Sequence, residues 1–426
     1  MDHKSGSKPA PHGSLLQGVK VLDFTTFLSG PFATQILADL GADIIKVETF
    51  EGDSSRAIPP HFIEGDSAYY LGNNRNKRSI ALNLKKPEGL ALALRLIAVS
   101  DVVIENFRPG VCERLGIDIS ALRQEHSALI WSSISGFGQT GPWKDKPAYD
   151  MVVQALSGVM SLTGEPNQPA MRLGIPAGDL VAGMYAVIGI LAALTARGRS
   201  KAGCRIDVSM LDGQLSMLSY QAVYTMLSGI PPKPQAAQHD SIPTYRSFKG
   251  GDGREFVVTA NTDKMWRDLC LVFGVPELIT DARFLNGRQR LLHREALAGI
   301  LEQACLAKSA ADWVEQLEKS GVPVALIKSV PEALADARQA GREMVVDLEG
   351  PDGQKISVIG NPVKISEYVT PTLRYPPRLA EDTDMLLQEL LGLGADEIES
   401  LRGQGVLMPC SATSEASQKG DACHAR

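Results

Sequence analysis

Residues 19–48 read VKVLDFTTFLSGPFATQILADLGADIIKVE, in which two short apolar runs flank a longer segment with helical spacing. Val19–Phe24 is typical of a buried strand, and Pro31–Leu40 is typical of a helix with proline in its first turn. Gly41 ends that helix, and Asp43–Glu48 predicts a second strand. A strand, a helix and a strand in this order form a βαβ unit, so the two strands are expected to be parallel.

The alternation of strands and helices continues along the chain. Further strands are predicted at 80–84, 101–105, 128–135 and 205–210, with helices at 87–99, 149–160, after Asp179 and at 211–228. This alternation predicts an α/β fold with a doubly wound, mostly parallel, Rossmann-like sheet. Ligands of such sheets bind at the carboxyl ends of the strands, so the loops that follow the strands are the candidate functional regions.

Composition divides the rest of the chain. The stretch SGIPPKPQAAQHDSIPTY at 228–245 is rich in proline, glycine and glutamine and predicts a change of unit. The last residues, SATSEASQKGDACHAR at 411–426, are poor in apolar side chains, which is typical of disorder. The expected division is a flexible leader at 1–14, a large α/β domain at 15–228, a linker at 229–245, a small α+β domain at 246–330, a linker and return to the large domain at 331–402, and a disordered tail at 403–426.

Charge and cysteine usage exclude several classes of protein. A formal net charge of −6 over 426 residues argues against a general nucleic-acid binder. The 6 cysteines are widely spread without a CxxC pair, which indicates reduced thiols rather than a zinc site or a disulfide framework. The polar N-terminus, MDHKSGSKPAPHGS, lacks the apolar core of a signal peptide, so a cytoplasmic protein is expected.

One apolar run resembles a membrane span. Leu180–Ala196 carries no charged side chain, but a helix of this length reaches only ~25 Å, whereas a bilayer core is ~30 Å thick. Its many small residues favour a tightly packed core helix, and no membrane partner is expected.

The first βαβ unit lacks the motif of a dinucleotide site. The loop TTFLSGP after its first strand has a single glycine, so the GxGxxG pattern of a nicotinamide site is missing from this unit, although Glu48 ends the second strand. Neither an HExxH metal motif nor a GxSxG nucleophile elbow occurs. A metal site, a dinucleotide site and a serine hydrolase are therefore not supported.

Basic side chains gather near two predicted strands that we expect to be neighbours. They are Arg75, Lys77, Arg78, Lys85 and Lys86 around one strand, and Arg108 and Arg114 after the next. A solvated surface with scattered ion pairs is one interpretation. The other is an anion site for phosphates, with Phe107 offering a face to a base.

Asp179 stands in GIPAGDLVAGMYAVIGILAAL, residues 174–194, just before a run of small apolar residues. An aspartate in this place is a good helix N-cap. The helix dipole also favours an ionised carboxylate there, and Ala182 and Gly183 leave room beside it. Spacing alone leaves both a capping and a reactive role open.

Six stretches occur in the order found in one enzyme family: LSGPFATQILADLGADIIKVE, NKRSIALNL, DVVIENFRPGVCERLG, SISGFGQTGPW, AYDMVVQALSGVMSLTG and GDLVAGMYAVIGILAAL. Together they resemble the class III coenzyme A transferases, over roughly residues 15–230 and more loosely to about 400. The resemblance implies transfer of CoA from an acyl-CoA thioester to a free carboxylic acid, without a permanently bound cofactor. It also implies an interlaced homodimer, and a nucleophilic aspartate that matches Asp179 and passes through mixed anhydrides and an aspartyl-CoA thioester.

The same matching implies the residues that contact CoA. They are Leu28, Ser29, Leu82, Asn83, Lys85, Asn106, Phe107, Arg108, Arg114, Tyr149 and Asp150, and the basic residues then serve the phosphates. Thr49 and Pro147 stand where formyl-CoA transferases have an arginine and a lysine. The mobile glycine run of those enzymes falls here on AQHD, residues 237–240, so the lid and the acid preference should differ.

Two other functions remain open. The α-methylacyl-CoA racemases share this fold but pair their aspartate with a histidine in a GHD motif, where this chain reads AYD with Tyr149. The loss of one acid/base partner ranks racemisation below transfer. A non-catalytic acyl-CoA binding protein is the second alternative. For a transferase, a small dicarboxylate such as succinate is the favoured donor or acceptor, and Arg172 is either a partner for its distal carboxylate or a surface arginine.

Overall fold

The computed structural model describes residues 13–409. Most of the expected leader and tail lies outside these residues. Within them, the expectation of disorder from residue 403 onward is wrong, because Val406 and Leu407 are fully buried and Leu407 forms a β-bridge with Leu82. Burial of these apolar side chains is favourable and fixes the segment on the core.

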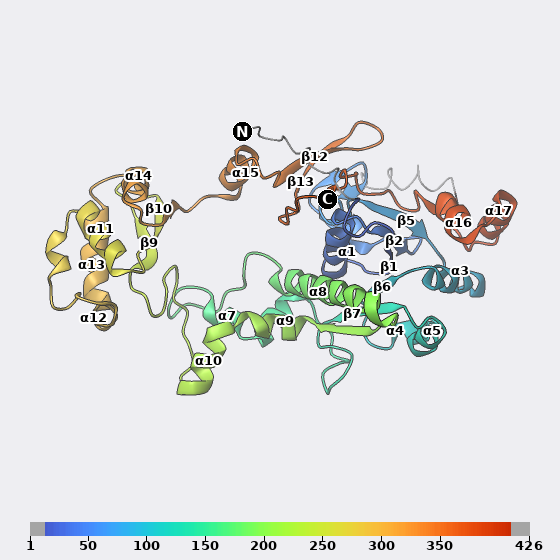
Figure 1. The fold of residues 1–426 in the computed structure, drawn as a ribbon, viewed down its shortest axis with the longest axis horizontal. Helices are drawn as coiled ribbons and strands as arrows, with labels where there is room; N and C mark the ends of the chain where they lie inside the picture. Colours follow the sequence, from blue (N-terminus) through green and yellow to red (C-terminus); the bar gives the residue numbers. More distant parts are fainter. Residues whose placement is uncertain (1–12, 410–426) are drawn as a thin grey trace, which may run out of the picture. The chain divides into compact units, whose positions relative to one another are not determined.

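A six-stranded sheet lies at the centre of the first of two compact units (Figure 1). Its order is β5-β2-β1-β6-β7-β8, and every neighbouring pair is parallel. The strands are β1 (Lys20–Asp23), β2 (Asp43–Glu48), β5 (Lys77–Ala81), β6 (Val102–Glu105), β7 (Ile130–Ser135) and β8 (Arg205–Ser209). Val21 pairs with Ile44 across β1 and β2, so the βαβ unit and the parallel α/β fold are confirmed.

Helices cover both faces of this sheet. Val21 packs in one core with α1 (Ser29–Asp39) and α8 (Ala177–Ser200). The next residue, Leu22, packs in the opposite core with α3 (Pro87–Ala98) and α16 (Thr383–Leu391). Successive side chains of a strand point to opposite faces, so a sheet buried on both sides has continuously apolar strands.

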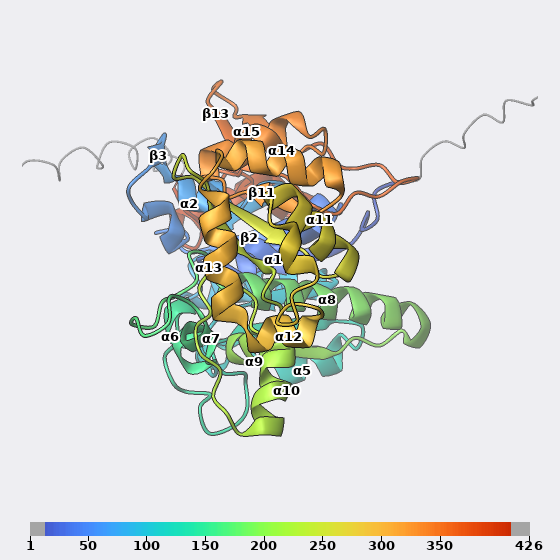
Figure 2. The same cartoon turned by 90° about the vertical axis from the view of Figure 1, so that its left-hand side faces the viewer.

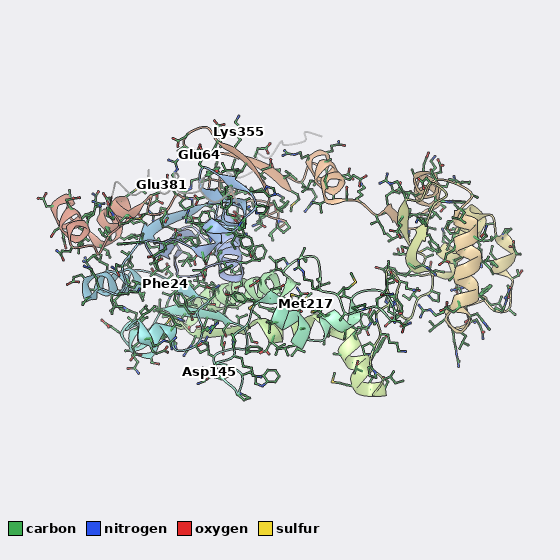
Figure 3. All side chains as sticks on the ribbon, turned by 180° about the vertical axis from the view of Figure 1, so that it is seen from behind. Phe24, Glu64, Asp145, Met217, Lys355 and Glu381 are labelled. Atoms are coloured by element: carbon green, nitrogen blue, oxygen red, sulfur yellow. The ribbon has the colours of Figure 1, made fainter. Side chains whose placement is uncertain are left out.

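The other elements of the first unit extend the loops of the sheet. They are η1 (Ser54–Ala57), β3 (Phe62–Ile63), β4 (Asp66–Ser67), α2 (Ala68–Leu71), α4 (Val111–Arg114), α5 (Ile119–Glu125), α6 (Asp150–Leu156), α9 (Met210–Met217), β12 (Val345–Glu349), β13 (Lys355–Ile359) and α17 (Ala395–Gly403). Among the residues labelled in Figure 3, Phe24 directly follows β1 and is buried, whereas Glu64, Lys355 and Glu381 are exposed.

A second unit comprises residues 160–171 and 228–341. Its antiparallel sheet runs β11-β10-β9, and its helices are prominent in Figure 2. The elements are β9 (Tyr245–Lys249), β10 (Glu255–Thr259), α11 (Asp263–Phe273), η2 (Pro276–Ile279), α12 (Gly287–Leu292), α13 (Arg294–Cys305), α14 (Ala310–Ser320), β11 (Val324–Leu326) and α15 (Val330–Gln339). Two helices, α7 (Val159–Leu162) and α10 (Ser219–Ser228), cross the unit boundaries.

The observed unit boundaries differ from the expected domains in three places. Residues 160–171 belong to the second unit although the surrounding chain belongs to the first, and the return to the first unit begins at 342 rather than 331. The expected linker at 229–245 is also part of the second unit, where the Ala237 carbonyl accepts a hydrogen bond from Ser247 N–H at 2.8 Å. The stretch 237–240 therefore pairs with the chain around β9.

Within the described residues, α8 is the one helix that is long and apolar enough to cross a membrane. Its small residues Ala182, Gly183 and Ala186 are buried, and they pack in the core that contains α1 and the sheet. A Cβ at Gly183 would lie 2.6 Å from the backbone oxygen of Ser29. The absence of a side chain at this position is what allows α8 to approach the start of α1.

Candidate active site

Asp179 lies in the first turn of α8 but does not cap it. The helix begins at Ala177, and its N-cap position is Pro176, without a side-chain hydrogen bond. The Gly178 N–H instead donates to Oδ1 of Asp150 at 2.7 Å. The capping interpretation of Asp179 is therefore wrong, because a second carboxylate from a different helix satisfies this free amide.

Asp150, the first residue of α6, fixes the start of α8. Its other oxygen, Oδ2, accepts a hydrogen bond from Gln154 Nε2 at 2.7 Å. Oε1 of Gln154 accepts the Leu173 N–H at 2.9 Å, so the same side chain also holds the segment that leads into α8. Together, Asp150 and Gln154 set where Asp179 points.

The environment of Asp179 changes its charge. Burial, and then the negative charge of Asp150, raise the pKa of Asp179 from its ordinary value of 3.8 to about 7, while a hydrogen bond from the Ser29 hydroxyl acts in the opposite direction. The ionised carboxylate that the helix dipole favours is therefore only partly formed, and roughly half of the Asp179 groups are ionised at pH 7. A pKa near the working pH is common for groups that carry out chemistry.

Asn106 joins the loop after β1 to the loop after β6. Its Nδ2 donates to the Thr26 carbonyl at 2.8 Å and lies 3.4 Å from Ser29 Oγ, while its Oδ1 accepts the Thr26 N–H at 2.9 Å. Leu28 lies between these contacts and is 5% exposed. Leu28, Ser29 and Asn106 are thus brought together beside Asp179, as the carboxyl ends of neighbouring parallel strands should bring them.

Three aromatic rings border the same place. The ring of Phe27 lies edge-on to those of Tyr69 and Tyr149, with centroids at 6.4 Å and 6.1 Å. Tyr149 is 67% exposed. Burial and the charges of Asp179 and Asp150 raise the pKa of Tyr69 to about 12, so Tyr69 remains a neutral hydroxyl.

Sequence reasoning missed Phe27 and Tyr69. Tyr69 belongs to α2, more than a hundred residues before Asp179 in the chain, and no spacing pattern connects the two. Phe27 stands next to predicted site residues, and only its positive φ of 65° distinguishes it in the structure.

The basic residues of β5 and the turn before it are not an anion site. Arg75 pairs with Asp39 at 2.6 Å, and Lys77 pairs with Asp23 at 3.3 Å. Arg78 is bound to Asp43. All three basic side chains are buried, and a buried charge needs a partner of opposite charge. The assignment of these three residues to phosphates is therefore wrong.

The other predicted CoA contacts follow β5 and β6. Leu82 is fully buried, so its side chain faces the core rather than a ligand. Asn83 Nδ2 donates to the Gly405 carbonyl at 3.3 Å, and Phe107 packs half-buried on the same core. The remaining predicted contacts are exposed and make no ion pair with described residues: Lys85, Arg108 and Arg114.

The predicted CoA contacts that follow β5 and those that follow β6 do not belong to adjacent strands of the sheet. In the sheet order, β2 and β1 lie between β5 and β6, which separates the two strand ends by about 14 Å at ~4.8 Å per strand. The expectation of neighbouring strands is therefore wrong, because the chain crosses over the sheet between them. Only an extended ligand can touch both groups.

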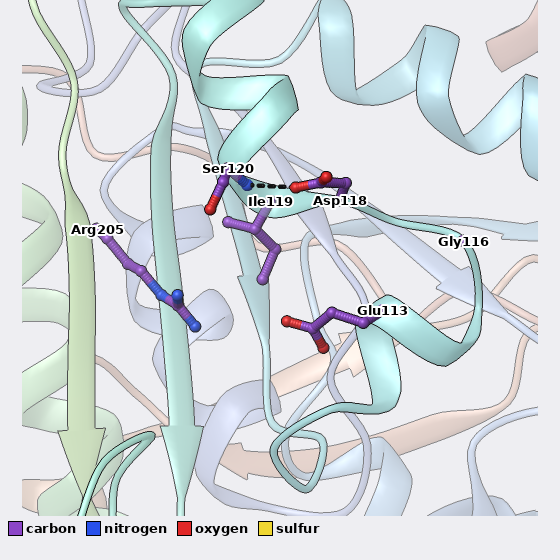
Figure 4. A pocket seen from close by; sticks show the side chains of 6 residues that line it. All are labelled: Glu113, Gly116, Asp118, Ile119, Ser120 and Arg205. Carbon is purple, nitrogen blue, oxygen red and sulfur yellow. Dashed lines mark hydrogen bonds between the residues drawn. The ribbon is translucent and has the colours of Figure 1, made fainter.

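Two further cavities lie in the first unit. A polar one of about 320 Å³ beside α4 and α5 is shown in Figure 4 and is lined by Glu113, Gly116, Asp118, Ile119, Ser120 and Arg205. A mainly apolar one of about 940 Å³ involves α1, α8 and β13. Neither is lined by Asp179, and residues 13–409 contain no cluster of three or more potential metal ligands.

The arrangement around Asp179 is suited to covalent catalysis by a carboxylate. A half-buried carboxylate lies at a helix start, near a hydroxyl group and a second carboxylate. Peptide N–H groups at a helix start stabilise negative charge that develops on a reacting carbonyl. No imidazole stands where the racemase pattern has one, since that position is Tyr149.

Comparison with known proteins gives consistent matches. The model of CoA-transferase family III matches residues 16–383. The chain is 38% identical over 382 residues to the succinate–glutarate CoA-transferase of Agrobacterium fabrum, across 88% of this chain and 95% of the relative. It is 40% identical over 384 residues to the acetyl-CoA:oxalate CoA-transferase of Acetobacter aceti, across 89% and 97% respectively.

A solved structure agrees with these matches. The crystal structure of a CaiB/BaiF family protein from Brucella suis has a TM-score of 0.80 to this chain, at 35% sequence identity. The match covers 89% of this chain and 100% of that chain.

Proposed function

This chain belongs to CoA-transferase family III, and from that premise we propose that its Asp179 is the nucleophile of CoA transfer from an acyl-CoA thioester to a carboxylic acid. The chain is an enzyme of the CoA-transferase class. The observation that carries the assignment to Asp179 is its half-buried carboxylate, whose pKa is raised to about 7 beside Ser29 and Asp150.

The proposed reaction conserves atoms and charge. A carboxylate oxygen of Asp179 attacks the thioester carbonyl, the C–S bond breaks, and CoA thiolate leaves a mixed anhydride. The thiolate attacks the Asp179 carbonyl of that anhydride, which releases the donor acid and forms an aspartyl-CoA thioester. The acceptor carboxylate then runs the two steps in reverse, and no proton is gained or lost overall.

The geometry supports this chemistry in two ways. An oxygen with a pKa near 7 is more basic, and so more nucleophilic, than an ordinary aspartate oxygen. The start of α8 and the Ser29 hydroxyl supply polar groups near the negative charge that moves during each step. Positioning, rather than proton transfer, is the main contribution of the protein.

The acid is proposed to be a small dicarboxylate such as succinate, as donor or acceptor. Relatives at 38% and 40% identity carry succinate, glutarate and oxalate in their names. Arg172, seven residues before Asp179, is exposed and forms no ion pair with any described residue. A guanidinium of this kind is available to bind the distal carboxylate of such an acid. For CoA, the exposed Lys85, Arg108 and Arg114 are the proposed phosphate ligands.

We propose that the enzyme works in the cytoplasm as a homodimer, without a membrane partner. Helix α10 has no buried residue, and its apolar side chains Met226 and Leu227 are 76% and 81% exposed. A helix with such a surface needs a partner to remove it from water.

Replacement of the nucleophile tests the assignment. Asp179→Ala should abolish CoA exchange between succinyl-CoA or acetyl-CoA and a panel of acids, because the proposed anhydrides and the aspartyl-CoA thioester all form on the Asp179 carboxylate. In the wild type, hydroxylamine or borohydride should trap a modification on Asp179 during turnover, detected by mass spectrometry. Glu318→Ala, which removes an exposed carboxylate of the second unit, is the matched control.

Two outcomes would contradict the proposal. Normal exchange by Asp179→Ala would remove Asp179 from the mechanism. Uptake of solvent deuterium at the α-carbon of a 2-methylacyl-CoA, without an acceptor acid, would indicate racemisation instead.

A further inference from the structure

The loop between β1 and α1 is held by side chains from other elements at three successive residues. Lys46 Nζ donates to the Thr25 carbonyl at 2.7 Å. Asn106 binds both the N–H and the carbonyl of Thr26, and Asp53 Oδ1 accepts the Phe27 N–H at 3.1 Å. Two residues later the chain reaches Ser29, whose hydroxyl lowers the pKa of Asp179 and whose backbone oxygen would lie 2.6 Å from a Cβ at Gly183, one helical turn after Asp179.

Lys46 and Asp53 form an ion pair of 2.8 Å, and neither side chain is exposed. Lys46 lies on β2, and Asp53 caps η1 by accepting the Ser55 N–H at 2.9 Å. A buried pair of this kind contributes little stability that apolar side chains of the same size would not. Its polar atoms are used instead to bind two peptide groups of the loop.

The conformation of Phe27 shows that the loop needs this support. Its φ is +65°, a left-handed conformation that is unfavourable for an aromatic residue and persists only where the surroundings impose it. In this conformation its N–H meets Asp53, while its ring lies between Tyr69 and Tyr149. The contact with Asp53 therefore couples the buried pair to the wall of the active site.

We propose that the Lys46–Asp53 ion pair is a positioning element for catalysis, which fixes the β1–α1 loop so that Ser29 meets Asp179. Both residues act through the loop, because neither reaches the surface. The inference rests on the proposed role of Asp179. It predicts that the pair matters for turnover more than for folding.

The test replaces the pair by apolar side chains of similar size. Lys46→Met/Asp53→Leu should fold, because two neighbouring buried ion pairs remain intact. They are Asp23–Lys77 and Glu48–Arg56. Its kcat should fall ~10–100-fold, as expected for a displaced catalytic group, with a smaller change in KM for acyl-CoA. Amide hydrogen exchange over residues 24–29 should become faster.

The pH profile is a second readout that a merely structural role would not change. Loss of the Ser29 contact should raise the apparent pKa for kcat/KM, because that hydrogen bond favours the ionised Asp179. Asp150 on α6 is the other titratable group that shifts the pKa of Asp179, and the charge of Asp179 in turn raises the pKa of Tyr69 on α2. Neither Asp150 nor Tyr69 is replaced in this variant.

Lys46→Met/Asp53→Asn is the decisive comparison, because it also removes both charges but keeps an oxygen for the Phe27 N–H. It should recover part of the lost kcat and of the exchange protection at 24–29. Arg75→Met/Asp39→Leu removes another buried pair in the same unit, with no contact to this loop, and should leave kcat and the pH profile unchanged.

Equal activity of the Leu and Asn variants, or wild-type exchange at 24–29 in both, would overturn the inference. An inactive wild type would contradict the proposed function instead, and the exchange measurement would still test the anchoring of the loop. If the Leu variant does not fold, the stability assumption behind the proposal is wrong.

Discussion

At Asp179 the surroundings, rather than the type of residue, set the charge. Burial and Asp150 favour the neutral acid, while Ser29 favours the carboxylate. An aspartate held between these influences is more basic than one in water, which raises its nucleophilicity at the cost of the ionised fraction. Asp150 also has a structural role, because its carboxylate accepts a hydrogen bond from the Gly178 N–H at the start of α8.

The pKa of Asp179 predicts a pH dependence. In the proposed mechanism the carboxylate is the reactive form, so kcat/KM should fall about tenfold per pH unit below a midpoint near 7. At pH 5 only ~1% of the free enzyme should be active, whereas an aspartate of ordinary pKa would still be ionised. The measurement is the initial rate of CoA exchange from pH 5 to 9.

The substitution Ser29→Ala tests the direction in which the midpoint of the pH profile moves. Removal of the hydroxyl donor should move the midpoint to higher pH. A flat profile down to pH 5, or a shift of the Ser29→Ala midpoint to lower pH, would contradict this account of the site.

At the scale of elements, the approach of α8 to α1 places Asp179 beside Ser29. Gly183 makes the approach possible, because a Cβ there would meet the Ser29 backbone oxygen at 2.6 Å and the Phe32 ring at 3.1 Å. The run of small residues after Asp179 is therefore a packing surface. This packing surface affects catalysis by setting the distance between the start of α8, which carries Asp179, and the start of α1, which carries Ser29.

Gly183→Ala should push these helices apart. The expected loss of stability is ~1–3 kcal/mol, as for other overpacked cores, and kcat for CoA exchange should fall because Ser29 and Asp179 separate. Thermal unfolding and steady-state kinetics measure the two effects.

Gly198→Ala on the same helix is the control. Nothing lies within 4 Å of a Cβ at that position, so this substitution should stabilise the protein by ~0.5–1 kcal/mol and leave kcat unchanged. Equal effects at Gly183 and Gly198 would show that helix spacing is not what matters.

At the scale of the whole molecule, much apolar surface is left on one chain. Besides Met226 and Leu227, Ile230 is 69% exposed, and α8 itself exposes Ile188 at 60%. Exposed apolar side chains of this size are typical of an interface between subunits.

We therefore expect a dimer in solution. Light scattering on a size-exclusion column should give twice the mass of one chain at micromolar concentration. Leu227→Glu should weaken the dimer, because a charge would have to be buried in the interface. A monomeric wild type with full activity would contradict the homodimer.

The parallel α/β sheet and the family could be predicted from the order of residues along the chain alone. Apolar periodicity and turn residues act between near neighbours, so the βαβ unit at 19–48 could be predicted from its own residues. The six ordered stretches likewise allowed the family to be predicted from the sequence, and the match to the family model confirms it.

Which basic side chains are buried in ion pairs, and which remain exposed, follows from the three-dimensional packing. Arg75, Lys77 and Arg78 looked like phosphate ligands in sequence, but their partners lie 36, 54 and 35 residues away. The pKa of Asp179 likewise depends on Asp150 and Ser29, which belong to other helices. Burial and charge interactions act through space, so neither can be read from the order of residues along the chain.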